Sequence, residues 1–161
     1  MFPNLVELDL SFTDLTDLSH LFKLSGRPTL KKLHLRKVLL NYDTGFVNNY
    51  VNLEEIDLSW CDSRNSSVFL PIQQFTALRK LEKIILSGLN LNSSYLDTHL
   101  NFSFFPNLKY LDLSDNRLTE FSESTLVALT SVVHLDLRGN LLAKFNFSAA
   151  FSYLTKLQSI D

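Results

Sequence analysis

Residues 108–118 read LKYLDLSDNRL, eleven positions that include two aspartates, a serine, an asparagine and an arginine. In isolation this stretch has the composition of a catalytic cluster, with Ser114 as a nucleophile between Asp112 and Asp115, or with the two carboxylates as an acid and a base. The stretch is not isolated, however, because the chain contains several similar copies of it. The copies are LVELDLSFTDL from Leu5, LKKLHLRKVLL from Leu30, LEEIDLSWCDS from Leu53, LEKIILSGLNL from Leu81, VVHLDLRGNLL from Val132 and a shorter LQSID from Leu157. Their starting residues are 23 to 28 positions apart, which indicates an array of structural repeats.

Every copy shows the same alternation of residue types. The first, fourth, sixth and eleventh positions are almost always Leu, Ile or Val, whereas the third, fifth and seventh are mostly polar. Alternation with a period of two predicts a short strand with one buried face. One strand per repeat predicts a parallel sheet that lines one side of a curved solenoid. The ninth position is asparagine in two copies, Asn116 and Asn140, and a short amide there can hydrogen-bond the neighbouring backbone where the chain leaves the strand.

The segments between the predicted strands carry apolar residues three positions apart. This spacing favours a turn or two of helix that packs its apolar side beneath the next strand. Phe46 and one of Phe104 or Phe105 are expected to hold the equivalent place in two other repeats, so most of the thirteen phenylalanines form a stacked spine rather than a cofactor site. The three clearest rows are Phe75, Leu78 and Leu81; Leu126, Leu129 and Val132; and Phe151, Leu154 and Leu157.

The pattern LxxLxLxxNxL resembles the leucine-rich repeat family, and the resemblance covers essentially the whole chain. It implies an α/β solenoid, a horseshoe segment with a parallel concave β-sheet and an irregular or short-helical convex side. Residues 1–161 are then one array of about six repeats and the start of a seventh. Val38 and Leu89 depart from the family's asparagine position, so the turn is expected to be less regular in those repeats and the polar row to be interrupted there.

The approach Phe-x-x-Leu-x-x-Leu before LDLSDNRL is similar to the repeats of extracellular receptors, above all the ectodomains of Toll-like receptors. This resemblance implies a receptor in which ligand binding brings two ectodomains together and signals through a cytoplasmic domain. Extracellular solenoids generally seal their ends with disulfide-linked caps, but Cys61 is the only cysteine here. We therefore expect the chain to be an uncapped, internal part of a longer solenoid.

The same repetition argues against enzymatic chemistry. A residue type that recurs in every repeat is expected to solubilise the outward face of the sheet, so no catalytic residue is predicted. The four histidines show no metal-ligand spacing, and no cofactor is predicted. Recurring serines are Ser11, Ser59, Ser87 and Ser114; recurring aspartates are Asp9, Asp57, Asp112, Asp136 and Asp161; the histidines are His20, His34, His99 and His134.

Composition indicates no electrostatically selected partner. The chain is 45% hydrophobic and 20% charged with a net charge of −2, so nothing specifically indicates nucleic acid or an acidic membrane surface. No apolar run approaches the length of a membrane span. The N-terminal MFPNLVELDL enters the first predicted strand at once and is not a signal peptide, so a secreted protein would need its targeting signal elsewhere.

Binding is therefore expected on the concave face or the flanks, where a protein or another macromolecule can reach the outward strand residues. The second repeat is basic and its neighbours are acidic, which predicts either a lattice of charge pairs between strands or a ligand contact. The exposed aromatics Phe12, Trp60 and Tyr110 are candidate binding contacts, although Trp60 can instead fold over the end of its strand against a convex loop. The candidate binding residues are Lys32, His34, Arg36, Glu55, Asp57, Trp60, Tyr110 and Asp112.

Four N-x-S/T sequons lie outside the predicted strands, at Asn65, Asn92, Asn101 and Asn146, and support an extracellular or secreted setting. Three functions stay open. The first is a binding segment of a Toll-like or related innate-immune receptor. The second is an intracellular repeat scaffold, such as the substrate-recognition arm of a cytoplasmic ubiquitin ligase. The third is an extracellular adhesive or structural protein.

Overall fold

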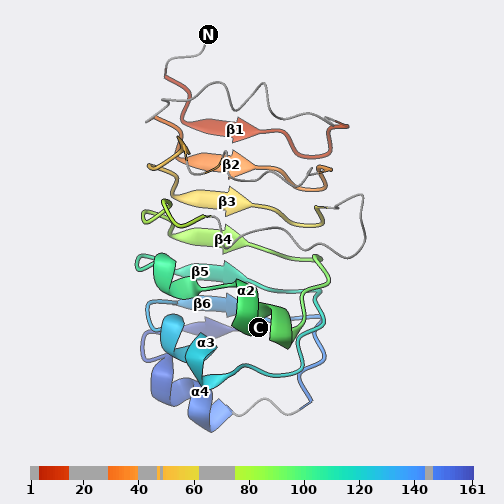
Figure 1. Cartoon of the computed structure of the whole chain (residues 1–161), viewed down its shortest axis with the longest axis vertical. Coiled ribbons are helices and arrows are strands. Elements are labelled where there is room, and N and C mark those ends of the chain that lie inside the picture. Colours follow the sequence, from red (N-terminus) through yellow and green to blue (C-terminus); the bar gives the residue numbers. More distant parts are fainter. Residues whose placement is uncertain (1–3, 15–28, 40–46, 48, 62–74, 144–146) are drawn as a thin grey trace.

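The computed structural model describes residues 4–14, 29–39, 47, 49–61, 75–143 and 147–161. These residues form a seven-stranded parallel sheet in which each strand pairs with the next one in the chain. Figure 1 shows the strands stacked one beneath another from the N-terminal to the C-terminal end. The strands are β1 (Glu7–Asp9), β2 (Lys32–His34), β3 (Glu55–Asp57), β4 (Lys83–Ile85), β5 (Tyr110–Asp112), β6 (His134–Asp136) and β7 (Ser159–Ile160). The predicted parallel solenoid is confirmed.

The strands pair in the register that the sequence repeats predict. The fourth residue of each repeat lies beside the fourth residue of the next, from Leu8 beside Leu33 to Leu135 beside Ile160. These central residues point into the core, and Ile56, Ile84 and Leu111 are fully buried. Full burial of one such side chain stabilises a fold by about 1.5–3 kcal/mol. The apolar first and sixth positions surround them, so one continuous core runs under the sheet.

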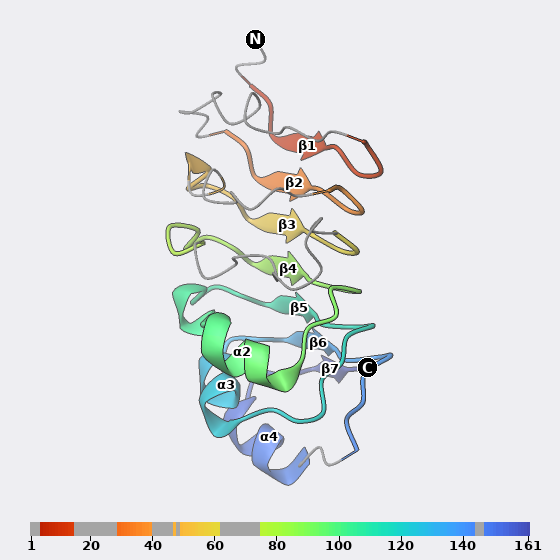
Figure 2. The ribbon, with the colours of Figure 1, turned by 45° about the vertical axis from the view of Figure 1, so that its right-hand side comes forward.

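The far side of the solenoid carries short helices in its C-terminal half. They are α2 (Ser93–His99), the 3-10 helix η3 (Phe102–Phe104), α3 (Glu123–Ala128) and α4 (Phe147–Tyr153). Figure 2 shows α2, α3 and α4 together on one side of the lower strands, so these helices leave the opposite face of the sheet open. Local caps fix where they begin: the side chain of Asn92 accepts a hydrogen bond from Tyr95 N, and that of Ser122 accepts one from Thr125 N. The irregular and short-helical convex side is confirmed.

The apolar spacing of three in the approach segments has a simple backbone cause. Leu78 N donates to Phe75 O and Leu81 N donates to Leu78 O, each at 3.2 Å. Bonds between residues three apart form a chain of turns, and they bring every third side chain to the same side. The predicted burial of Phe75, Leu78 and Leu81 is therefore correct, but the predicted helix over this segment is wrong.

Other rows follow or break this rule according to their hydrogen bonding. Phe105 is buried and Phe104 is only half-buried, so Phe105 holds the spine position. Phe46 lies outside the described residues. Phe151 was predicted to be buried and is 52% exposed. In α4, Leu154 N donates to Ala150 O, four residues back, so helical periodicity turns Ala150 rather than Phe151 toward the core.

Asparagines at the ninth position hold neighbouring repeats together, as predicted. Asn116 is buried, and its Oδ1 accepts hydrogen bonds from Leu89 N (3.1 Å) and Leu91 N (3.0 Å) of the preceding repeat. Its Nδ2 donates to three backbone carbonyls. Asn140, which is only partly buried, accepts from Leu118 N at 3.0 Å. The side chains therefore replace backbone partners that the turn leaves unpaired.

The repeats without this asparagine keep the left-handed eighth residue of the turn. Val38 and Leu89 bury apolar side chains and interrupt the polar row, as predicted. The residue before each of them is nevertheless left-handed, with φ of 58° at Lys37 and 69° at Gly88, as in the other repeats. The prediction of a less regular turn is wrong for Val38, but it is correct for the Leu89 repeat, in which the next residue, Asn90, is also left-handed with φ of 57°.

Replacing Asn116 by Ala should lower the free energy of unfolding by about 2–5 kcal/mol, because two buried N–H groups lose their acceptor. Asn140→Ala is the matched control and should cost less, because its Oδ1 accepts a single backbone N–H. Urea unfolding followed by circular dichroism measures both. Equal losses below about 1 kcal/mol would contradict the bridging role of Asn116.

Candidate functional site

The outer face of the sheet presents two rows of side chains that the strand register aligns. The first row consists of the third residue of each repeat: Glu7, Lys32, Glu55, Lys83, Tyr110, His134 and Ser159. The second row consists of the fifth residue: Asp9, His34, Asp57, Ile85, Asp112, Asp136 and Asp161. Six of the predicted binding residues lie in these rows: Lys32, His34, Glu55, Asp57, Tyr110 and Asp112. Arg36 and Trp60 lie beyond the ends of β2 and β3.

Charges in the first row, and those one residue before the strands, pair between neighbouring repeats. The pairs are Lys32–Glu7 (3.7 Å), Lys83–Glu55 (2.9 Å), Lys31–Glu54 (2.8 Å) and Lys109–Glu82 (2.9 Å). The predicted lattice of charge pairs is confirmed. Each exposed pair contributes only about 0–1 kcal/mol to stability. In the basic second repeat, the pairs of Lys31 and Lys32 compensate two of its cations.

His34 interrupts the row of aspartates between Asp9 and Asp57. Its Nε2 lies 4.0 Å from Glu7 Oε1 and is buried without a hydrogen-bond partner.

The aspartate row closes the turn at the end of each strand. Asp9, Asp57 and Asp112 each accept a hydrogen bond at 2.8 Å from the backbone N–H two residues further on, and Asp136 does so at 3.1 Å. An acceptor placed in this way stabilises a turn locally. The recurring aspartates therefore have a structural role, and for Asp136, which is only 4% exposed, the predicted solubilising role is wrong.

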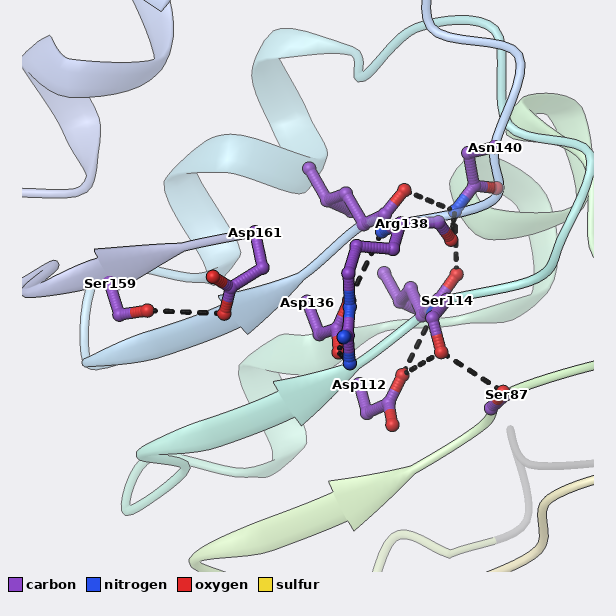
Figure 3. Close-up of polar contacts among 10 residues, drawn as sticks. Ser87, Asp112, Ser114, Asp136, Arg138, Asn140, Ser159 and Asp161 are labelled. Carbon is purple, nitrogen blue, oxygen red and sulfur yellow. Dashed lines mark hydrogen bonds and ion pairs between the residues drawn. The ribbon is translucent and has the colours of Figure 1, made fainter.

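The serine row is buried rather than outward. Ser59, Ser87 and Ser114 are each less than a tenth exposed, so the prediction that this position solubilises the surface is wrong. Figure 3 shows Ser114 between Asp112 and Ser87: its Oγ lies 2.6 Å from Asp112 Oδ1 and 3.0 Å from Ser87 Oγ. The hydroxyl is part of a buried polar row. This burial also explains why an apparent catalytic cluster recurs in the sequence.

Arg138 adds an ion pair to the sixth repeat. Its guanidinium contacts both carboxylate oxygens of Asp136, at 3.0 Å and 3.1 Å from Nε and at 2.5 Å from Nη2 (Figure 3). Hydrogen bonding from Arg138 holds the pKa of Asp136 below its ordinary value. The pKa of Asp9 is lowered in the same direction by hydrogen bonds from the side chain and backbone of Ser11.

Tyr110 forms the centre of the outer face. Lys83 Nζ lies 5.2 Å from the centroid of the Tyr110 ring, and the His134 ring lies 6.3 Å away on the other side. Burial, followed by the charges of Asp112 and Asp136, raises the pKa of Tyr110, so the hydroxyl stays protonated at neutral pH. The ring is half-buried between its neighbours rather than fully exposed, and its hydroxyl can act as a hydrogen-bond donor.

The turns after the strands form a third row along one edge. The eighth residue of six successive repeats has a left-handed φ: Phe12, Lys37, Trp60, Gly88, Asp115 and Gly139. Phe12 is 65% exposed, as the sequence predicted, and Trp60, for which the sequence left exposure or folding over its strand end open, is 45% exposed. Trp60 lies over the next turn, because a Cβ added to Gly88 would be 2.3 Å from its ring. Sequence reasoning missed Gly88, whose role depends on a contact between repeats.

Comparison with known proteins agrees with this architecture. Leucine-rich repeat descriptions match residues 89–142 and residues 3–18. No curated protein matches the sequence. The chain is a leucine-rich repeat solenoid. Within the described residues, no helix is both long enough and apolar enough to cross a membrane.

Solved leucine-rich repeat structures share the fold at low sequence identity. A leucine-rich repeat protein of Leptospira interrogans is 24% identical with a TM-score of 0.69 over 99% of this chain. An internalin of Listeria monocytogenes is 18% identical with a TM-score of 0.61 over 99% of it. A chain of the Toll–Spatzle complex of Drosophila is 20% identical with a TM-score of 0.67 over 98% of it. This solenoid spans 37%, 48% and 23% of those chains, respectively.

Cys61, the only cysteine in the sequence, is partly buried and packs against the core. Cys61 Sγ lies 2.9 Å from Leu35 O of the preceding repeat, at the position that Asn116 occupies in its own repeat. Burial raises the pKa of the Cys61 thiol to about 12, so the reactive thiolate is scarce at neutral pH. Among the described residues there is no group of three potential metal ligands.

Two of the four sequons lie in the described part of the solenoid. Asn92 and Asn101 are exposed on the convex side, and each accepts backbone hydrogen bonds through Oδ1. Their side-chain nitrogens, where a glycan attaches, are not needed for these bonds. Asn65 and Asn146 lie outside the described residues, as does His20.

Acid should destabilise this solenoid partly through Asp136. Because its folded pKa is lowered, its stabilising contribution is present above the unfolded value near 3.8 and is lost as pH falls through the folded pKa. Asp136→Asn should therefore be less stable than the parent at neutral pH and should lose less stability between neutral pH and acid. Arg138→Gln should produce the same flattening. Unfolding free energies measured across this range that run parallel in all three proteins would contradict the assignment.

Gly88→Ala should destabilise the solenoid by about 1–2 kcal/mol, because φ is positive there and the new methyl group displaces Trp60. Trp60 is the only tryptophan, so its emission should shift to longer wavelength. Gly139→Ala is the matched control: its φ is also positive, but it contacts Asp115. It should destabilise the protein without changing tryptophan emission. An unshifted spectrum in Gly88→Ala would refute the packing of Trp60 on Gly88.

Proposed function

We propose that this chain is a non-enzymatic ligand-binding segment of an extracellular receptor of the Toll-like type, and that its partner is a protein bound on the outer face of the sheet. The observation that carries the proposal is the open face itself. The helices α2, α3 and α4 lie on the other side of the sheet (Figure 2), so the aligned rows, apart from the buried Asp136, remain available to a partner. Repeat solenoids commonly bind through such an extended surface.

The receptor setting draws support from several independent features. One of the structures with the same fold is a complex of Toll with Spatzle. The exposed sequons on the convex side can accept glycans without covering the outer face, and we extend this proposal to Asn65 and Asn146. In the intact receptor, binding would bring two such ectodomains together.

Two other functions fit the same fold. An intracellular scaffold, such as the recognition arm of a cytoplasmic ubiquitin ligase, would present the same open face but carry no glycans. An extracellular adhesive protein would carry glycans but lack a signalling domain. Glycan occupancy, together with the coding sequence on both sides of this chain, separates the three.

The central residues of the outer face give the sharpest test. The chain, secreted as a tetrameric fusion, is applied to an array of secreted proteins, and binders are titrated against variants. Tyr110→Ala combined with Lys83→Glu should lower the affinity for a partner of the outer face by about tenfold or more. A tenfold change corresponds to about 1.4 kcal/mol of binding free energy. Both substitutions alter the centre of the outer face.

Phe151→Ala is the control, since this exposed side chain lies on α4 behind the sheet. It should leave binding unchanged. Binders that respond to Phe151→Ala but not to the Tyr110 and Lys83 variant would place the partner on the convex side and contradict the proposal.

A further inference from the structure

The left-handed turn row changes character along the solenoid. In the first three repeats it carries Phe12, Lys37 and Trp60, and in the next three it carries Gly88, Asp115 and Gly139. Backbone geometry does not explain the difference, because φ is between 53° and 69° in all six turns. Large side chains at a left-handed position are unfavourable, and glycine or asparagine is the usual choice. The first three turns therefore keep bulky exposed residues where the fold itself favours small ones.

Two cations lie between the aromatic residues of this edge. Arg36 and Lys37 are exposed, and neither forms an ion pair within the part of the chain that the structure describes. Lys31 and Lys32, in the same repeat, each pair with a glutamate. The positive charge that remains uncompensated in this repeat is therefore concentrated at the turn.

The rings of Phe12 and Trp60 each contact a residue of the next repeat. The Arg36 guanidinium carbon lies 5.5 Å from the centroid of the Phe12 ring, and the Trp60 ring is seated on Gly88. Neighbouring strands are separated by roughly 4.8 Å, so Phe12 and Trp60, two repeats apart, are roughly 10 Å from one another. That distance corresponds to roughly three residues of an extended peptide.

We propose that Phe12, Arg36, Lys37 and Trp60, hereafter the turn patch, bind an acidic segment of a partner protein. A carboxylate of the segment pairs with Arg36 and Lys37, and apolar side chains on either side of it pack on Phe12 and Trp60. A planar guanidinium binds a carboxylate through two parallel hydrogen bonds, and exposed tryptophan gains the most when a partner removes it from water. This inference rests on the proposed function, because it adds a second contact for the same kind of partner.

Charge favours a short acidic segment over a polyanion. Asp9 and Asp57 lie on the strands that lead into the turns of Phe12 and Trp60, and the whole chain has a net charge of −2. A nucleic acid or a sulfated polysaccharide would bring many negative charges past these aspartates, with two unpaired cations to offset them. One or two carboxylates flanked by apolar residues match the turn patch without this repulsion.

The experiment selects ligands from a random-peptide library on the full chain and measures their binding by Trp60 fluorescence. Trp60 is the only tryptophan, so its emission reports on the turn patch alone. Selected peptides should be enriched in Asp or Glu next to apolar residues and should change the emission on binding. Arg36→Glu combined with Lys37→Glu should weaken them by about tenfold or more.

Arg117→Glu combined with Lys156→Glu is the matched control. It makes the same change in net charge at exposed residues of other repeats and should leave the affinity within about twofold. Trp60→Leu provides a second variant, read by labelled peptide instead of tryptophan emission. It should also weaken binding by about tenfold, because the aromatic contact is lost.

Several results would overturn the proposal. Selected peptides that are neutral or basic, or that bind the Arg36 and Lys37 variant as tightly as the parent, exclude the turn patch. Heparin or a single-stranded oligonucleotide that binds the turn patch more tightly than the acidic peptides makes it a polyanion site. If only Tyr110→Ala abolishes the binding of the acidic peptides, they bind the outer face. That result would support the proposed function and contradict the turn-patch proposal. Conversely, if peptides bind the turn patch and no partner binds the outer face, only the proposed function is contradicted.

Discussion

The structure depends on in-register pairing of each repeat with the next. A strand of three residues cannot be stable alone, so its N–H and C=O groups must be matched by those of its neighbours. The pairing continues past the strands: Leu35 N donates to Asp57 O, Leu86 N to Asp112 O and Leu113 N to Asp136 O, at 2.8–2.9 Å. Each repeat thereby fixes the position and orientation of the following one. The same bonds continue through the turn after the strand, which explains why its eighth residue stays left-handed in the repeats of Val38 and Leu89.

Once the register is fixed, each position of the repeat has one physical environment along the whole solenoid. The fourth position fills the core, the aspartates of the fifth position accept a backbone N–H, and the serines of the seventh are buried beside them. Asn116 ties its repeat to the one before it through two backbone N–H groups. These positions have little freedom to vary. The third position of the outer face and the side chains of the turn row do not make these bonds, and there the residue type differs from one repeat to the next.

Contacts that follow from the common repeat pattern were predictable from the sequence, and contacts that only one pair of repeats makes were not. Strand register, the buried fourth position and the amide bonds of Asn116 follow from a pattern visible within each copy. The burial of Phe151 was predicted wrongly because turns with a period of three and α-helix with a period of 3.6 diverge within one segment, and only the hydrogen bonds of α4 decide between them. The seat of Trp60 on Gly88 joins residues 28 positions apart, and nothing near either residue in the sequence indicates it. The same limit applies to the candidate site: the sequence identified Lys32, Glu55 and Tyr110 as outward residues but could not show which charges neutralise one another.

That distribution of paired and unpaired charge decides which surfaces can gain free energy from an ionic partner. On the outer face, a carboxylate that approached Lys83 would compete with Glu55 at 2.9 Å and with the Tyr110 ring, so much of the new attraction would replace an existing one. Recognition there must come mainly from shape and from hydrogen bonds to groups such as the Tyr110 hydroxyl. Arg36 and Lys37 have no carboxylate to give up, and the aromatic rings beside them already lie in fixed positions. An acidic partner therefore forms its ion pair at the edge of the solenoid without breaking one, and the aspartates of the adjacent outer face restrict its acidic part to that edge.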